Sequence, residues 1–235
     1  MSIKINYLKK ANNRPSENTV LFSDEKFKIN ILKKYLSNSE FSYLADISKT
    51  IDIKKNIFVF EITSKKKIVL ISIKNNLKRS DIENLGAEFY GRINHGKNSV
   101  YAIISDSVKS KYENFLGHFL HGLKLKSYEF KKYKTKNESR IISINVTGNK
   151  NKPSASNQLK FKALEEGTFF ARDLVSEPGN VLHPDEYAKR INTLRKDGLK
   201  ITIYDQKKLK KLGMSALLGV GQGSVRGSYL VTMEW

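Results

Sequence analysis

The stretch NIFVFEITSKKKIVLISI, residues 56–73, decides the fold class of this 235-residue chain. Two runs rich in Ile, Val and Phe lie on either side of a short lysine-rich turn. Runs of β-branched and aromatic residues separated by a few polar residues are typical of a β-hairpin. Strands and helices alternate around this hairpin, which indicates a layered α/β arrangement. We therefore expect a largely buried sheet.

Strands and helices alternate on both sides of this hairpin. Further β-rich runs lie at 19–23, 99–105 and 139–146. Helical periodicity indicates three helices. The first is expected to begin near Asp24, with Phe27, Ile31 and Leu32 on one face. The second is expected to cover 78–94 with Ser80 as its cap, and the third to cover 109–126. This alternation predicts an α/β class, with a layered α/β domain over residues 1–147.

Residues 148–178 are expected to form a linker and an interdomain helix. The segment 147–157 contains Gly, Pro and Ser but no large apolar residue, and an amphipathic pattern follows it up to Pro178. In residues 179–235 a helix, a strand at 199–205, a helix capped by Asp205 and a final strand follow one another. This β-α-β order predicts parallel pairing and the first part of an incomplete second α/β domain.

Composition excludes several classes of protein. The chain has no cysteine, so it has neither disulfides nor thiolate metal ligands. No stretch approaches the ~20 apolar residues of a membrane span, and charges interrupt the N-terminus where a signal peptide needs apolar residues. We expect a cytoplasmic protein that does not contact the membrane.

The net charge of +20 is concentrated in residues 1–150, which carry +15. Such a charge attracts nucleic acid, and Lys131, Lys132 and Lys134 lie among Tyr128, Phe130 and Tyr133. The alternative is compositional, because a chain rich in Lys, Asn and Ile carries lysine on every solvated face. We favour the compositional interpretation, since lysine outnumbers the arginine used for base recognition. If the chain binds nucleic acid, it should retard duplex DNA, and this retardation should weaken steeply as the salt concentration rises.

Two patterns that suggest chemistry do not match their motifs. Gly219, Gly221 and Gly223 lack the spacing of a dinucleotide loop and lie before a strand, so they favour a tight connection. Ser224 lacks the surroundings of a hydrolase nucleophile. The histidines and the charged residues Arg172, Asp173 and Glu177 also favour structural roles.

The four histidines are His95, His118, His121 and His183. Only His118 and His121 share a helical face, and that face supplies no carboxylate for a metal, so partly exposed helix histidines are expected. His183 precedes Pro184 as a helix-entry residue. Arg172, Asp173 and Glu177 suggest acid–base chemistry but are interpreted as surface charges on a terminating helix.

Three stretches together resemble the leucyl (cytosol) aminopeptidase family. They are FLHGLKLKSYEFKKYKTK at 119–136, ARDLVSEPGNVLHPDEYA at 171–188 and KKLGMSALLGVGQGSVRGSYLVTMEW at 210–235. The last two are specific in combination and order, whereas the first 100 residues match only in α/β pattern. Ser176, Gly179 and Ser215 depart from the usual Asn, Ala and Gly, and no proline follows Ser224.

The resemblance implies a macro-domain-like N-terminal domain and metal-dependent release of N-terminal amino acids from peptides. In the family, a lysine, three aspartates and a glutamate hold two divalent ions, zinc or manganese, and a second lysine and an arginine assist. All follow the strand that corresponds to residues 229–235. No catalytic, metal-binding or substrate-binding residue is therefore assigned here, and the chain is interpreted as a truncated member that binds no cofactor by itself.

Further expectations follow from this interpretation. The isolated chain is predicted to be inactive, and to accept a peptide only if a C-terminal fragment completes it. The family's homo-hexamer is not expected, because most of the trimer-forming catalytic domain has no counterpart here. Leu217, Leu218, Leu230 and Val231 are predicted to lack cover. The alternatives are a basic nucleic-acid-binding module and a non-functional gene remnant.

Overall fold

The computed structural model describes residues 2–8, 18–50, 55–94, 99–135 and 141–235. The chain divides into two compact units, Met1–Phe169 and Phe170–Trp235. The division falls inside the helix that the sequence assigns as interdomain. The domain limits expected at residues 147 and 178 stay predictions.

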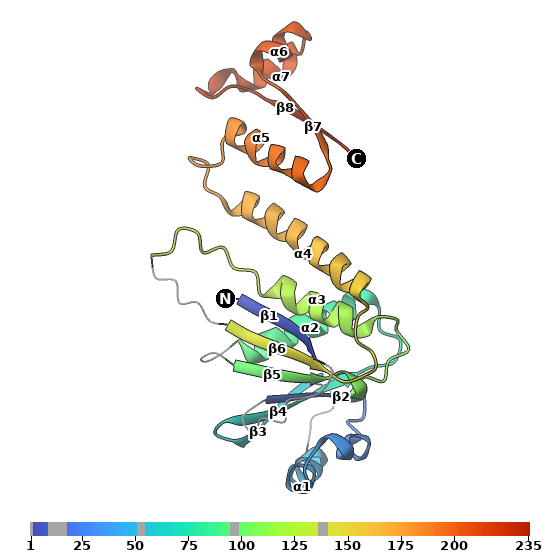
Figure 1. The fold of residues 1–235 in the computed structure, drawn as a ribbon. Helices are drawn as coiled ribbons and strands as arrows, with labels where there is room; N and C mark the ends of the chain where they lie inside the picture. Colours follow the sequence, from blue (N-terminus) through green and yellow to red (C-terminus); the bar gives the residue numbers. More distant parts are fainter. Residues whose placement is uncertain (1, 9–17, 51–54, 95–98, 136–140) are drawn as a thin grey trace. The chain divides into compact units, whose positions relative to one another are not determined.

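The first unit is built on a six-stranded sheet with helices on its faces (Figure 1). The strand order is β1-β6-β5-β2-β4-β3, and only the β3–β4 pair is antiparallel. The α/β class and the hairpin at 56–73 are thereby confirmed. The elements are β1 Ser2–Leu8, β2 Asn18–Asp24, η1 Ile29–Tyr35, α1 Asn38–Ile47, η2 Ser48–Thr50, β3 Ile57–Thr63, β4 Lys66–Ile73, α2 Arg79–Ile93, β5 Ser99–Ile104, η3 Ser105–Ser107, α3 Phe115–Lys126, β6 Ile141–Thr147 and α4 Ala155–Ser176.

The buried strands divide their side chains between two cores. Val20 and Phe22 of β2 pack with the apolar residues of α2 and α3, whereas Leu21 packs with those of η1 and α1. Successive strand residues point to opposite faces, so a strand covered on both sides must be apolar at consecutive positions. Figure 1 shows α2 and α3 on one face of the sheet and α1 on the other.

Two glycines set how closely α2 and α3 approach. A Cβ atom on Gly86 would lie 1.9 Å from the carbonyl oxygen of Phe119, and one on Gly122 would lie 1.9 Å from that of Glu83. Each helix thus places a glycine against the backbone of the other. This contact places Glu83 of α2 against the backbone of α3.

The second unit contains the C-terminal end of α4, a two-stranded sheet and short helices. Its further elements are α5 Pro184–Asn192, η4 Thr193–Asp197, β7 Lys200–Tyr204, α6 Gln206–Lys211, α7 Ser215–Val220, η5 Gly221–Gly223 and β8 Leu230–Glu234. Helix α4 ends two residues before Pro178, as expected from its fixed φ and missing N–H. The Asp205 carboxylate accepts a hydrogen bond from the Lys208 N–H at 2.9 Å, which confirms the predicted cap.

The strands β7 and β8 pair antiparallel, so the prediction of parallel pairing is wrong. A parallel connection needs one helix that runs back along the whole strand. Here Gly213, at φ 69°, separates two helices of six residues, each rising only about 9 Å. The chain therefore leaves and returns at the same end of the sheet.

Three helix starts also differ from the sequence prediction. Asp24 ends β2 and accepts hydrogen bonds from the N–H groups of Lys26 and Lys28, so it caps a turn, and only a 3₁₀ helix follows at η1. Helix α2 has Lys78 at its N-cap instead of Ser80, and the Asp81 carboxylate accepts from the Lys78 N–H. Helix α3 begins at Phe115 instead of residue 109, because Asn114 adopts a left-handed φ of 54°.

Candidate functional site

The glycine cluster of the second unit serves as a connection between α7 and β8. A Cβ atom on Gly221 would lie 2.1 Å from the Ser228 hydroxyl, whereas open space surrounds Gly219 and Gly223. The Ser224 hydroxyl accepts a hydrogen bond from the Arg226 N–H at 3.1 Å. These contacts agree with the interpretation of a tight turn.

Glu177 is buried, so its interpretation as a surface charge is wrong. Its side chain is only 1% exposed, and its Oε1 accepts a hydrogen bond from Nη1 of Arg190 at 2.8 Å. Nε of Arg190 also donates to Glu186 at 3.1 Å. The hydrogen bond to Glu177 raises the pKa of the Arg190 guanidinium. The contact joins the residue after α4 to α5 within the second unit.

The two helix histidines are paired with carboxylates from other helices. Nδ1 of His118 lies 3.2 Å from Oε1 of Glu83 on α2, and Nδ1 of His121 lies 3.3 Å from Oε1 of Glu165 on α4. The face of α3 itself supplies no carboxylate, but folding brings one to each imidazole. His121 is also buried, at 5% exposure, so the prediction that it is a partly exposed histidine is wrong.

The remaining histidines lie elsewhere. His183 is the N-cap residue of α5, as its position before Pro184 predicts, and its Nδ1 contacts the Asp185 carboxylate. His95 lies outside the described residues. Across the described part of the chain, no group of three His, Cys, Asp or Glu side chains is placed to hold a metal ion.

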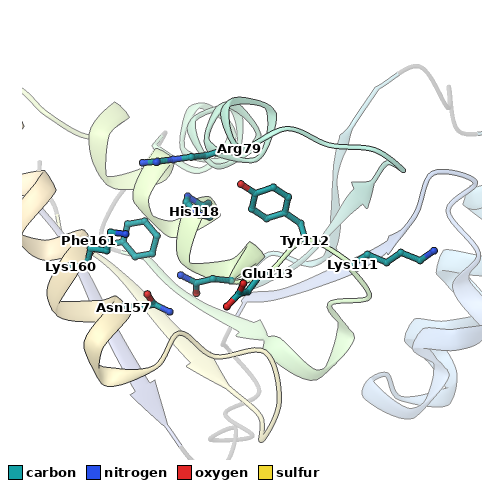
Figure 2. A pocket seen from close by; sticks show the side chains of 9 residues that line it. Arg79, Lys111, Tyr112, Glu113, His118, Asn157, Lys160 and Phe161 are labelled. Atoms are coloured by element: carbon teal, nitrogen blue, oxygen red, sulfur yellow. The ribbon is translucent and has the colours of Figure 1, made fainter.

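A pocket of about 440 Å³ surrounds His118 in the first unit (Figure 2). Three segments form it: the start of α2, the loop before α3 with the first turn of that helix, and one face of α4. We call it the His118 pocket. Its described lining residues are Arg79, Lys111, Tyr112, Glu113, Asn114, His118, Asn157, Lys160 and Phe161.

Glu83 connects the charged groups beside the His118 pocket. Its Oε1 accepts from Nε of Arg79 at 2.8 Å and contacts Nδ1 of His118 at 3.2 Å. Burial by itself raises the pKa of the Glu83 carboxyl, but the hydrogen bonds from Arg79 and His118 outweigh burial and lower it. The Phe161 ring packs edge-on against His118, with 5.1 Å between ring centroids.

The groups that line the His118 pocket are suited to binding a polar ligand. Arg79, Lys111 and Lys160 are cations, and Asn114 and Asn157 supply amide groups. The nine described lining residues include no Ser, Thr or Cys. Beside the Glu83–His118 pair, the Tyr112 ring packs edge-on against His118 with 5.6 Å between ring centroids, so the hydroxyl of the described lining is a phenol.

The aromatic and lysine segment after α3 is partly folded onto the first unit. Tyr128 packs against Phe169 with 5.3 Å between ring centroids, while Phe130 contacts Tyr133 at 5.8 Å. Nζ of Lys131 pairs with the Glu129 carboxylate at 2.5 Å. One of the three lysines weighed for nucleic acid is therefore neutralised by a neighbouring carboxylate.

Comparison with known proteins shows which family's catalytic domain the second unit matches. Residues 169–235 match the model of the cytosol aminopeptidase family, catalytic domain. Over 170 residues the chain is 38% identical to a probable cytosol aminopeptidase of Nitrobacter winogradskyi. Over 122 residues it is 42% identical to one of Caulobacter vibrioides. The chain belongs to the cytosol aminopeptidase family.

The chain corresponds to only part of these aminopeptidases. The Nitrobacter alignment covers 68% of this chain and 33% of the relative, and the Caulobacter alignment covers 48% and 24%. The chain thus spans about a third of the length of curated family members that it matches.

Solved structures confirm the fold. A tomato leucine aminopeptidase mutant aligns with a TM-score of 0.75 at 17% identity, over 99% of this chain and 50% of that chain. A bottromycin maturation enzyme, BotP, solved in complex with Mn, aligns with a TM-score of 0.68 at 14% identity, over 93% of this chain and 45% of that chain. Both likenesses show the aminopeptidase fold alone. In the described residues, no helix is long and apolar enough to cross a membrane.

Sequence reasoning missed the carboxylate partners of this aminopeptidase-family chain. Glu83 and His118 lie 35 positions apart on two helices, and Glu165 lies 44 positions from His121. Helical spacing predicts neighbours only within one helix. Gly86 and Gly122, which bring α2 and α3 together, were the signal of this contact available in the sequence. The positions of these glycines in the sequence do not reveal which side chains come into contact.

Proposed function

We propose that this chain is the N-terminal part of a metal-dependent aminopeptidase and that it does not hold the hydrolytic centre itself. The complete enzyme would release N-terminal amino acids from peptides, with zinc or manganese as the metal. The observation that carries the proposal is the match of residues 169–235 to the family's catalytic domain, in a chain that spans about a third of its relatives.

The chemistry of peptide hydrolysis supports the second half of the proposal. Attack on a peptide carbonyl near neutral pH requires an activated water and a Lewis acid at the carbonyl oxygen, and a pair of metal ions supplies both. Anionic ligands must hold the two ions a few ångströms apart. In support of the proposal, no group of three His, Cys, Asp or Glu side chains in the described residues is placed to hold a metal ion.

Several apolar side chains of the second unit are exposed, which supports the proposal that further polypeptide covers them in the complete enzyme. Val175, Val220, Val225 and Trp235 are each at least 87% exposed. Leu217, Leu218, Leu230 and Val231, which were predicted to lack cover, are instead half-buried. The uncovered surface is therefore made by residues other than the four predicted from sequence. A C-terminal fragment that packs here would complete the catalytic domain.

We expect the purified chain to release no leucine from leucine p-nitroanilide, with or without added Mn²⁺ or Zn²⁺. The reason is the lack of a metal-anchored water among its residues. Release would be followed by absorbance at neutral pH, with a full-length cytosol aminopeptidase assayed beside it as the positive control. Metal-dependent release that co-elutes with the folded chain and disappears with a chelator would contradict the proposal.

Nucleic-acid binding is a second candidate function with narrower support. Tyr133 is 52% exposed, and the ammonium of Lys132 lies 5.6 Å from its ring centroid, which is an arrangement suited to base stacking beside a cation. The pairing of Lys131 with Glu129 weakens the case. Binding to duplex DNA with a steep salt dependence stays a prediction for residues 128–134.

A further inference from the structure

A pocket larger than the His118 pocket lies at the carboxyl ends of the parallel strands β2 and β4. Its volume is about 810 Å³, within the range of small-molecule sites. The residues that line it come from three loops, after β2, after β4 and after η3, from the strand ends beneath them, and from η1, which supplies Ile31. We call it the edge pocket. All of its lining residues belong to the first unit.

The topology of the sheet explains why an opening exists there. The loop after β2 leads to η1 and α1, whose residues pack on one face of the sheet. The loops after β4 and η3 lead to α2 and α3, which pack on the other face. Loops that diverge to opposite faces leave a crevice at the carboxyl edge, which is where open α/β sheets bind their ligands.

The charges that line the edge pocket are mainly positive. Five lysines line it: Lys26, Lys28, Lys74, Lys109 and Lys111. Among the described residues, none of these five forms an ion pair. Lys111 lines both pockets, and Figure 2 shows its side chain extending away from His118.

The two carboxylates in the lining are engaged with uncharged donors. Oδ1 of Asp24 accepts from the N–H groups of Lys26 and Lys28 at 3.1 and 3.0 Å. Oε1 of Glu25 accepts from the Asn75 amide at 3.3 Å. Neither contact neutralises a lysine ammonium. The pocket therefore has an excess of positive charge, which favours an anionic ligand.

One wall of the edge pocket is apolar. Phe22, Ile31, Ile73, Leu77 and Tyr112 contribute to it, beside the lysines. Phe22 and Ile73 are buried, and Ile31, Leu77 and Tyr112 are half-buried. A surface that served only to bind inorganic anions would have no use for such a wall. The combination suits a ligand that joins an anionic group to an apolar or aromatic body.

Unusual backbone conformations cluster in the loops at this edge of the sheet. The described non-glycine residues with positive φ are Phe27, Asn76, Asn114 and Asn151, and they follow β2, β4, η3 and β6 respectively. Asparagine adopts this conformation readily, whereas a phenylalanine held there is strained. Phe27 is held in place by burial and by an edge-on contact with Phe58 at 5.1 Å. Strain of this kind concentrates at ligand sites.

We propose that the edge pocket binds an organic polyphosphate, with the phosphates at the lysines and the body against the apolar wall. This is a binding function separate from peptide hydrolysis, and it does not depend on the proposed aminopeptidase activity. The ligand class follows from the charge excess, the adjoining apolar wall and the position at the carboxyl edge.

The test is calorimetric titration of the full chain with ATP and with tripolyphosphate at physiological salt. The double variant Lys74→Gln/Lys109→Gln removes two ammonium groups from the pocket, whereas Lys126→Gln/Lys207→Gln removes two exposed ammonium groups elsewhere. The net charge falls equally in both, so general attraction of anions is matched. Circular dichroism checks that both variants are folded.

We expect saturable ATP binding at one site, weakened at least about tenfold by Lys74→Gln/Lys109→Gln, because each lost bond to a charged group is substantial. The control variant should stay within about twofold of the parent chain. Tripolyphosphate should bind more weakly than ATP, since it leaves the apolar wall empty. Equal weakening by both double variants, equal affinity for the two probes, or no saturable ATP binding would overturn the proposal.

Discussion

Replacement of Gly122 by alanine is expected to lower the free energy of unfolding of the first unit by about 3 kcal/mol or more. The added methyl group would lie 1.9 Å from the carbonyl oxygen of Glu83 and 2.5 Å from its carbonyl carbon. These are backbone atoms of a neighbouring helix, so no side-chain rotation relieves the clash. Overpacking that moves backbone costs about 1–3 kcal/mol and sometimes more.

Gly91 provides a matched control on α2. A Cβ atom there would meet nothing within 4 Å. Alanine at an open helix position is expected to stabilise by about 0.5–1 kcal/mol, because it restricts the unfolded chain. Urea unfolding monitored by circular dichroism would measure both variants. A Gly122→Ala variant as stable as the parent chain would show that α2 and α3 do not cross at these glycines.

The second large effect is expected for Arg190→Met in the second unit. The variant removes the guanidinium that donates a 2.8 Å hydrogen bond to the Glu177 carboxylate, whose side chain is 1% exposed. Removal of one member of a buried ion pair costs about 3–5 kcal/mol, because the remaining charge stays desolvated. The Arg190 side chain is itself 20% exposed, which places the expectation toward the lower end of that range.

Lys189→Met is the control, because Lys189 is adjacent in α5, its side chain is 80% exposed and it makes only a 3.9 Å contact with Glu186. It should change stability by less than about 0.5 kcal/mol. Amide hydrogen exchange of α5 and β7 reports local unfolding of this unit. The double variant Glu177→Gln/Arg190→Met should recover part of the loss. Equal exchange rates in the parent, Arg190→Met and Lys189→Met chains would contradict the account of a buried pair.

The parts of the fold that the sequence predicts are those with strong local patterns. Consecutive apolar residues in β2 and β4 indicate strands covered on both faces, and both are confirmed. Strand β1 was not predicted, although Ile3, Ile5 and Tyr7 alternate with Lys4 and Asn6 in the pattern of a half-buried strand, and it pairs with β6. Helix α1 was also not predicted, although Ser37 and Glu40 form a capping box whose spacing is readable.

Errors in the sequence reading arise where a local signal has two structural outcomes. Asp24 has the chemistry of a helix cap, and in the structure the same carboxylate caps a turn. The pairing direction of β7 and β8 depends on where the intervening helix breaks, and Gly213 alone does not specify this. The edge pocket was not predicted because its lysines come from three separate loops.

These 235 residues are proposed not to anchor a pair of catalytic metal ions. Calorimetric titration of the purified chain with Mn²⁺ and with Zn²⁺ tests this proposal most directly, with a full-length cytosol aminopeptidase stripped of metal as the comparison. We predict no site tighter than about the millimolar range in the chain, because isolated imidazole–carboxylate pairs supply too few ligands. Stoichiometric binding of two ions per chain at micromolar affinity would contradict the claim.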